Sequence, residues 1–303
     1  MRKKFLFVPF VILIVVALDL INRVFCDYCL DNINRNSTLY RNNIFTTIDF
    51  KSDVLVIGAS KAEHGYNTRM LSDSLNLVVY NAGNDGQNIN YQYITLKNAL
   101  KKGNIKMVIL DIARSQIGDD WAKRVYYHKN YYWKNEEVRL YFDKVTPWYE
   151  HYFMLSSFYQ YNGRFLSMLS SLFENQKDTL MGYHPIPPTT LVNKTQYPDV
   201  DTPFIPSNVG KIYLDKIAET CKYNQIELII CWSPCLYNDN PWREYLISYC
   251  ANADVKFWDY SNYFDRNKCR KYFKDEHHIS SIGADIFTTS LYNRIKEEIL
   301  NSK

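Results

Sequence analysis

The segment K-D-E-H-H-I-S-S-I-G, residues 274–283, places an aspartate shortly before two adjacent histidines. In D-x-x-H spacing, Asp275 and His278 can share one side of a turn, where the carboxylate would orient the imidazole as a general base. His277 is expected to point elsewhere, because adjacent side chains in a turn diverge. Such a base needs a nucleophile, and the nucleophile must come from another part of the chain.

A serine suited to this role ends the run D-V-L-V-I-G-A-S, residues 53–60. Gly58 and Ala59 permit a tight turn, so that Ser60 would begin a helix with its hydroxyl in the crevice at the strand end. The backbone N–H of Ser60, at a helix N-terminus, can face a developing negative charge. The structural alternative is that Ser60 only caps the helix.

Two glycines follow the next apolar run, in Y-N-A-G-N-D-G-Q. Gly83 and Gly86 let the backbone approach a ligand closely, and their N–H groups can donate to an oxyanion. The alternative is a turn that needs positive φ at these positions. His64, four residues after Ser60, is expected to be a surface or packing residue, because an isolated histidine makes no site on its own.

Five apolar runs would position these residues, and each is continuous rather than alternating. Continuous runs are typical of parallel strands buried on both faces, and helical patterns lie between them. The sequence therefore predicts an α/β fold, with a flavodoxin-like parallel sheet covered by helices on both faces. Ligands bind such sheets at the carboxyl ends of the strands. The expected strands lie within residues 53–60, 77–83, 106–112, 226–233 and 255–261, and the expected helices are 88–101, 208–224 and 284–300.

An insertion, residues 113–207, separates the third and fourth expected strands. Insertions of this length usually form lids or binding loops. Its aromatic side chains could stack on sugar rings, although they would equally well form the insertion's own core. The aromatic residues concerned are Tyr126, Tyr127, Tyr131, Tyr132, Trp133, Trp148 and Tyr149.

The N-terminus has three basic residues, 2–4, followed by an unbroken apolar run, Phe5 to Leu18. No A-x-A cleavage signal follows, which favours an uncleaved transmembrane signal anchor over residues 1–21. The polar residues 22–50 would form a stalk, and residues 51–303 would form an extracytoplasmic domain under the positive-inside rule. The alternatives are a cleaved signal, which would release a secreted domain, and a buried helix.

The composition argues against nucleic-acid binding, because the net charge is only +4 and the basic residues are scattered. The seven cysteines include a C-x-x-C at Cys26 and Cys29 that lacks a βαβ context. Cys231 and Cys235 have no nearby histidine ligands. We therefore expect neither a metal nor another cofactor.

The order of these motifs resembles the SGNH/GDSL hydrolases, especially their membrane-anchored, extracytoplasmic members, over roughly residues 53–115 and 210–300. The resemblance implies that Ser60 in G-A-S is the nucleophile and Gly83 an oxyanion donor beside the Ser60 N–H. It also implies that Asp275 and His278 are the acid and the base. Where the family has an oxyanion asparagine after the third strand, this chain has Arg114, Ser115 and Gln116. Asn84 is an alternative donor.

The resemblance implies a serine esterase or acyl-transfer enzyme that works through an acyl-serine intermediate without a metal. The expected substrate is an extracytoplasmic ester, such as an O-acyl group of a glycan. The competing function is a non-catalytic binding or assembly protein that retains the fold. The unmatched asparagine favours this alternative, and the retained serine, aspartate and histidine oppose it.

Overall fold

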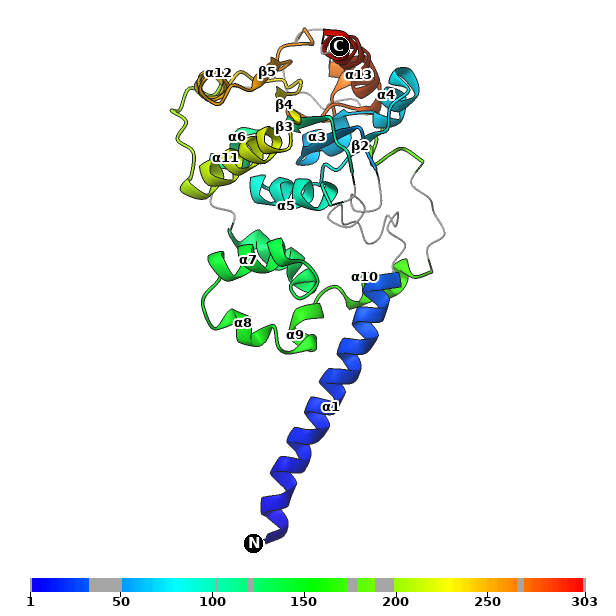
Figure 1. Ribbon diagram of the computed structural model, residues 1–303, viewed down its shortest axis with the longest axis vertical. Coiled ribbons are helices and arrows are strands. Elements are labelled where there is room, and N and C mark those ends of the chain that lie inside the picture. Colours follow the sequence, from blue (N-terminus) through cyan, green and yellow to red (C-terminus); the bar gives the residue numbers. More distant parts are fainter. Residues whose placement is uncertain are drawn as a thin grey trace. The chain divides into compact units, whose positions relative to one another are not determined.

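The computed structural model describes residues 2–32, 51–101, 103–118, 122–173, 179–188, 199–265 and 270–301. The chain divides into two compact units, residues 1–41 with 121–177 and residues 42–120 with 178–303. The second unit contains the sheet, and the first contains the long N-terminal helix (Figure 1). Most of the predicted stalk, residues 33–50, lies outside the described residues.

The sheet has five parallel strands in the order β2-β1-β3-β4-β5. This is the flavodoxin-like order, in which ligands bind where the direction of winding reverses, between β1 and β3. The predicted α/β fold class is therefore confirmed, and each strand lies within the run expected for it. The strands are β1 Val54–Gly58, β2 Val79–Asn81, β3 Met107–Asp111, β4 Glu227–Trp232 and β5 Lys256–Asp259.

Helices cover both faces of the sheet, which explains why the central strands are apolar throughout. One core includes Val56 of β1, Ile109 of β3 and Ile229 of β4, packed against α3, α4 and α13. The opposite face packs against α5 and α11 (Figure 1). These helices are α3 Ser60–Gly65, α4 Thr68–Leu75, α5 Ile89–Ala99, α11 Asn208–Tyr223 and α13 Ser281–Asn301.

A further helix, α12 Asn240–Ala253, lies beside β5 and was not predicted. Its start signals are present in the sequence. Asp239 accepts a hydrogen bond from the Trp242 N–H as N-cap, and Pro241 follows in the first turn. The remaining short elements of this unit are α6 Arg114–Gly118 and η2 Arg270–Tyr272.

The other unit pairs the N-terminal helix with the middle of the predicted insertion. Helix α1 packs against α9 and α10, while α7 packs against η1. Residues 113–207 therefore divide between the two units instead of forming one body. The elements of this unit are α1 Arg2–Asn32, η1 Ala122–Tyr131, α7 Glu136–Val145, α8 Glu150–Phe153, α9 Ser157–Tyr161 and α10 Phe165–Ser171.

The insertion's aromatic side chains fall into two groups. Tyr131 and Tyr132 are buried, and the Trp133 indole N–H donates to the Met154 carbonyl at 2.9 Å. Tyr131 and Tyr132 therefore belong to the core of the unit, as the simpler interpretation expected, whereas Trp133 is 44% exposed. Trp148, in contrast, is 74% exposed. The lid or substrate platform stays a prediction.

Helix α1 is long and apolar enough, over Phe7–Asn32, to cross a membrane, and a stretch of 18 residues within it has a mean hydropathy of 2.2. A signal sequence near an N-terminus meets the same criteria of length and composition. The helix continues eleven residues beyond the predicted anchor boundary at Ile21, to Asn32. Polar residues there are compatible with a helix because they contact α9, as described below.

Candidate active site

Ser60 is the first residue of α3, immediately beyond the carboxyl end of β1. The turn before it requires glycine at position 58. A Cβ there would lie 2.5 Å from the Asp111 carbonyl oxygen and 2.7 Å from Cβ of Ala62. The missing side chain allows β1, β3 and α3 to approach closely, which places Ser60 at the reversal point of the sheet.

The loop that ends in His278 is a closed turn. The Lys274 N–H donates to the His278 carbonyl at 2.8 Å, and Phe273 bridges Ile279 in antiparallel pairing. Asp275 Oδ1 also accepts the backbone N–H groups of His277 and His278, at 2.8 and 2.9 Å. The aspartate therefore shapes the turn that carries its own histidine partner.

Asp275, His278 and Ser60 form one hydrogen-bonded chain. His278 Nδ1 lies 2.9 Å from both carboxylate oxygens of Asp275, and Nε2 lies 2.7 Å from Ser60 Oγ. An ionised carboxylate can only accept, so Nδ1 carries the proton of a neutral imidazole and Nε2 accepts from the hydroxyl. The structure thus brings these three predicted residues together, in the orientation that a serine nucleophile and its base require.

Asp275 remains ionised under ordinary conditions. Burial acts to raise the pKa of Asp275, but the hydrogen bonds from His278 and from the His277 N–H outweigh burial and hold that pKa at about 2. The carboxylate is therefore available to accept from His278 Nδ1 at any pH where proteins are normally assayed. Its role in orienting the imidazole does not depend on titration.

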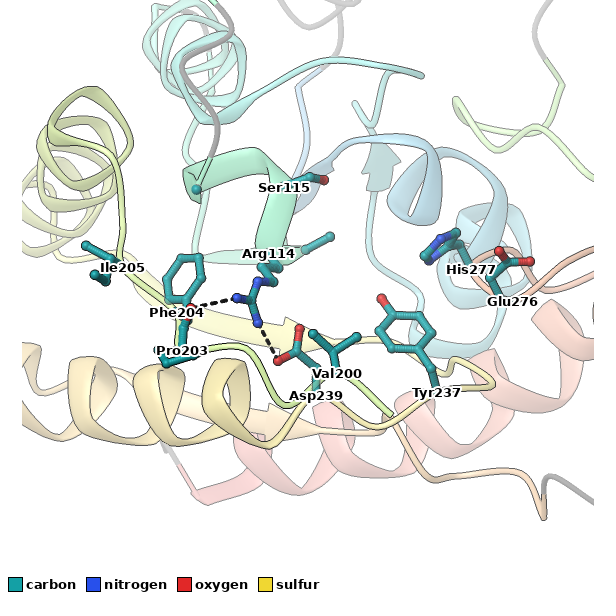
Figure 2. A pocket seen from close by; sticks show the side chains of 12 residues that line it. Arg114, Ser115, Val200, Pro203, Phe204, Ile205, Tyr237, Asp239, Glu276 and His277 are labelled. Atoms are coloured by element: carbon teal, nitrogen blue, oxygen red, sulfur yellow. Dashed lines mark hydrogen bonds and ion pairs between the residues drawn. The ribbon is translucent and has the colours of Figure 1, made fainter. Parts of the chain in front are cut away.

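His277 points away from the hydrogen-bonded chain of Asp275, His278 and Ser60. Its side chain lies edge-on to the Tyr237 ring, with centroids 5.0 Å apart, and it borders a neighbouring cavity (Figure 2). Burial, followed by the charge of Lys61, lowers the pKa of His277. This placement agrees with the divergence expected for adjacent side chains in a turn.

The Gly83 N–H, a predicted oxyanion donor, donates to Asn81 Oδ1 at 2.9 Å. Gly83 also packs directly on α3, where a Cβ would lie 2.5 Å from the Glu63 nitrogen. Asn84 donates its backbone N–H to the Gly58 carbonyl and its amide Nδ2 to the Tyr91 hydroxyl, both at 3.1 Å. To bind an oxyanion, the Gly83 N–H would have to share or give up its bond to Asn81, and Asn84 would have to share or give up its bonds to Gly58 or Tyr91.

The Ser60 N–H differs from these two. As the first residue of a helix, Ser60 has no carbonyl one turn earlier in that helix to receive its N–H. The N–H therefore belongs to the set of free helix-start donors that bind anions. It is the simplest of the three predicted donors to use.

Sequence reasoning missed Asn81, which ties the end of β2 to α3. Its Nδ2 donates to the carbonyls of Ala62, at 2.7 Å, and of Tyr66, at 3.2 Å, and the residue is fully buried. Because its Oδ1 accepts from Gly83, one amide ties the loop after β2 to α3, the helix that begins at Ser60. The only signal was an asparagine at a strand end.

His64 also lies closer to the site than expected. Its ring centroid is 6.2 Å from that of His278, edge-on, and Nδ1 lies 2.7 Å from the His184 carbonyl. A carbonyl only accepts, so Nδ1 carries the proton. The spacing of four residues from Ser60 on one helix was the available signal, since such residues share a face.

Two buried ionisable residues, Lys61 and Asp111, lie near the start of α3. The Lys61 ammonium donates to the Ser233 carbonyl at 3.0 Å, and Lys61 is only 8% exposed. Asp111, at the end of β3, is fully buried, and neither carboxylate oxygen has a hydrogen-bond partner among the described residues. Burial raises the pKa of Asp111, and the charge of Lys61 opposes that rise.

A cavity of about 590 Å³ adjoins the site at the ends of β3 and β4. Figure 2 shows Arg114 between Phe204 and Asp239, with Tyr237 and His277 farther along the cavity wall. The Arg114 guanidinium pairs with Asp239 at 2.8 Å and also donates to the Thr202 and Pro203 carbonyls. Arg114 is therefore already committed to protein partners, which leaves the cavity without a free positive charge from this residue.

Among the described residues, no three His, Cys, Asp or Glu side chains are grouped so as to hold a metal ion. The four cysteines that the sequence analysis considered, at positions 26, 29, 231 and 235, are buried free thiols.

No protein-family model and no curated protein matches this sequence. Three solved structures are similar to the chain at low identity. A Streptococcus pneumoniae protein considered to be a platelet activating factor has 12% identity and a TM-score of 0.44, covering 90% of this chain and 96% of its own. A GDSL-like lipase from Bacteroides thetaiotaomicron has 13% identity and a TM-score of 0.40, covering 82% and 88%.

The third structure, a Bacteroides fragilis protein considered to be an acylhydrolase, has 15% identity and a TM-score of 0.40, covering 88% of this chain and 98% of its own. All three TM-scores lie below 0.5. The description of the fold therefore rests on the strand order and register of this chain.

Proposed function

We propose that this protein is a serine esterase or acyl-transfer enzyme that forms an acyl intermediate on Ser60. The observation that carries the proposal is the hydrogen-bonded chain from Asp275 through His278 to Ser60, with the 2.7 Å contact between Nε2 and Oγ. Nucleophile, base and orienting acid are the parts that this chemistry needs, in the required order.

In the proposed reaction, Ser60 Oγ attacks the ester carbonyl while His278 Nε2 takes the hydroxyl proton. The tetrahedral intermediate collapses, and His278 returns the proton to the departing alcohol. Water or a second hydroxyl then attacks the acyl-serine, again with His278 as base, and releases the acid or the transferred ester. Asp275 holds the imidazole and stabilises its charged form in both halves.

The oxyanion would bind to backbone N–H groups. The Ser60 N–H is the first donor, because it begins α3. The Gly83 N–H is the second, if the oxyanion replaces its bond to Asn81. Asn84 is a weaker third donor, since its amide already donates to Tyr91.

We propose an uncharged substrate group for the cavity beside His277, in keeping with an O-acyl group on a glycan. Arg114 is paired with Asp239, so the cavity has no free guanidinium for an anionic group. Phe204, Ile205 and Tyr237 give the cavity an apolar lining that an acylated sugar could contact, and the acyl carbonyl would then extend toward Ser60.

We further propose that residues 1–21 anchor the protein in a membrane and that the domain from residue 51 is extracytoplasmic. The basic residues 2–4 would stay in the cytoplasm under the positive-inside rule. The apolar surface of α1 supports this placement: Phe7 and Leu13 are 66% and 67% exposed. A cleaved signal with a secreted domain is the alternative.

The second candidate function is a non-catalytic binding or assembly protein. It is favoured by the protein partners of Gly83 and Asn84 and by Arg114, which stands where an oxyanion asparagine would be expected. Such a protein would use the cavity to hold a glycan without cleaving it.

Labelling by a fluorophosphonate probe distinguishes the two functions. An activated Ser60 reacts covalently, so we expect labelling of the wild type and none of Ser60→Ala. Ser115→Ala is the matched control, because Ser115 is exposed and borders the cavity but, within the described part of the chain, makes no hydrogen bond to a histidine. An unlabelled wild type of native circular dichroism would overturn the esterase and favour the binding protein.

A further inference from the structure

Asp19 is a carboxylate within the apolar part of α1, and its partners lie on α9. Asp19 Oδ1 accepts the Ser156 hydroxyl at 2.8 Å, and Oδ2 accepts the Ser157 N–H at 3.1 Å. Helix α9 has no side-chain cap from its own N-cap residue, so Asp19 supplies one from another part of the chain. These contacts fix α9 at one level along α1.

The next turn of α1 strengthens this attachment. Asn22 Nδ2 donates to the Ser157 hydroxyl at 2.8 Å, and Arg23 Nη2 donates to the Leu155 carbonyl at 2.7 Å. Arg23 Nη1 also donates to Gln160 Oε1 at 3.2 Å. The segment 155–160 is therefore attached to α1 directly after its apolar run ends.

A group of exposed apolar side chains lies within residues 148–158, the segment that leads into this attachment. We call it the aromatic collar, and its members are Trp148 (74% exposed), Tyr149 (45%), Tyr152 (55%), Phe153 (50%), Leu155 (61%) and Phe158 (54%). Neighbouring rings are in contact, with centroids 6.0 Å apart for Trp148 and Tyr152 and 5.9 Å for Tyr149 and Phe153. Soluble surfaces rarely expose such groups without a partner.

Glu150, the one acidic residue between positions 148 and 158, has hydrogen-bond and charge partners within the same unit. Its carboxylate accepts the Tyr159 hydroxyl, and the Lys129 ammonium lies over the Tyr159 ring, 4.3 Å from its centroid. The collar therefore presents rings, hydroxyls and a leucine rather than a free negative charge. Amphipathic rings of this kind are enriched where membrane meets water.

The length of α1 agrees with this environment. From Phe5 to Ile21 the helix advances about 25 Å at 1.5 Å per residue. This apolar run alone is shorter than a hydrocarbon core of roughly 30 Å, and the exposed Val24 and Phe25 of the next turn continue its apolar surface. Apolar side chains around the outer end of such a helix would extend its apolar surface toward the full thickness. The collar lies at that end, because Asp19 and Arg23 hold it there.

We propose that the aromatic collar lies in the interfacial layer of the same bilayer that α1 enters. The occupant is a lipid surface rather than a protein, because the collar continues the exposed apolar surface of α1, where Val16 and Leu18 are both 52% exposed. This inference rests on the proposed membrane anchoring and is independent of the proposed esterase.

The test uses the full chain reconstituted in vesicles of phosphatidylcholine and phosphatidylglycerol. Single variants Leu155→Cys and Leu140→Cys carry an environment-sensitive fluorophore. These leucines are matched, since both belong to the same unit and are 61% and 55% exposed, but Leu140 lies on α7, outside the collar. Val16→Cys reports on α1 itself. The wild-type protein, which has cysteines of its own, is treated with the fluorophore in the same way, and its fluorescence is subtracted from that of each variant.

We expect the fluorophore at residue 155 to emit at shorter wavelength and to be quenched severalfold more by lipids with a shallow nitroxide than the one at residue 140. An aqueous signal at residue 155, with residue 16 in lipid, overturns the collar and leaves the anchor intact. Aqueous signals at both residues overturn the collar and the anchor together. A lipid-independent shift at residue 155 that grows with protein concentration indicates self-association and also overturns the proposal.

Ester hydrolysis by each labelled variant is measured alongside. The labelled positions lie outside the hydrogen-bonded chain of Ser60, so activity is expected to match that of the unlabelled protein. If neither the wild type nor any labelled variant hydrolysed the ester, the result would count against the proposed esterase and leave the collar untouched.

Discussion

His278 Nε2 lies 2.7 Å from Ser60 Oγ, although 218 residues separate them in the chain. His277, one position away, faces Tyr237 instead. We expect His278→Ala to lower kcat/KM for p-nitrophenyl acetate by several orders of magnitude, because the serine loses its base. His277→Ala should change kcat/KM much less. Steady-state kinetics on both variants, with folding checked by circular dichroism, compares them.

His277→Ala is the matched control for His278→Ala, because the two histidines are adjacent in the chain. If His277→Ala abolished activity and His278→Ala did not, the assignment of the base would be wrong by one position. If both variants and Ser60→Ala kept wild-type activity, the esterase proposal would fail.

Asp275→Asn should also lower kcat/KM, by roughly 10³–10⁴-fold. An asparagine amide can donate to Nδ1, which lets the imidazole adopt the tautomer that cannot accept from Ser60. The loss should appear in kcat, with KM little changed, because Asp275 acts through His278. An Asp275→Asn enzyme with kcat near wild type would show that the carboxylate does not orient the base.

The low pKa of Asp275, about 2, predicts an acid dependence of stability. A carboxyl group whose pKa is depressed by folding stabilises the native state above its unfolded value, near 4, and loses that contribution as pH falls toward 2. The thermal midpoint of the wild type should therefore fall toward that of Asp275→Asn between pH 4 and pH 2. A constant difference between the two proteins across this window would contradict the assignment.

Ile205→Ala should weaken binding of a glycan ester. Ile205 borders the cavity and is 79% exposed, so that a bound sugar ring could cover it. We expect KM for an acetylated disaccharide to rise about fivefold, as for the loss of roughly 1 kcal/mol of apolar contact. KM for p-nitrophenyl acetate should stay the same, because that ester does not fill the cavity.

Ile212→Ala is the control for this prediction. Ile212 lies on α11, is 40% exposed and does not border the cavity. Equal changes in KM for the two variants, or equal effects on both esters, would show that the cavity does not bind the glycan.

Lys61→Met should destabilise the sheet unit by about 1–3 kcal/mol, because it leaves the buried Ser233 carbonyl without its donor and removes the cation whose charge opposes the rise in the pKa of Asp111. The double variant with Asp111→Asn should recover part of that loss. Denaturant unfolding of both single variants and the double variant measures the coupling. Lys211→Met, at an exposed position on α11, is the control and should have little effect. Strictly additive losses would mean that Lys61 and Asp111 do not interact.

The sequence by itself determined the features that depend on short stretches of chain. Unbroken apolar runs predicted all five parallel strands, because buried strands need apolar residues on both faces. The D-x-x-H turn was also local, so the pairing of Asp275 with His278 followed from spacing. The start of helix α12 was also marked locally, by Asp239 at the N-cap and Pro241 in the first turn, so this helix too was predictable.

Only the tertiary structure decided which distant groups meet. The contact of His278 with Ser60 depends on the strand order, and Asn81 meets the carbonyls of Ala62 and Tyr66 only because α3 packs on the sheet. The division of residues 113–207 between two units depends on the contacts of Asp19 with α9, over 138 positions of sequence. Sequence patterns record local periodicity and spacing, whereas these partners are set by the packing of whole elements.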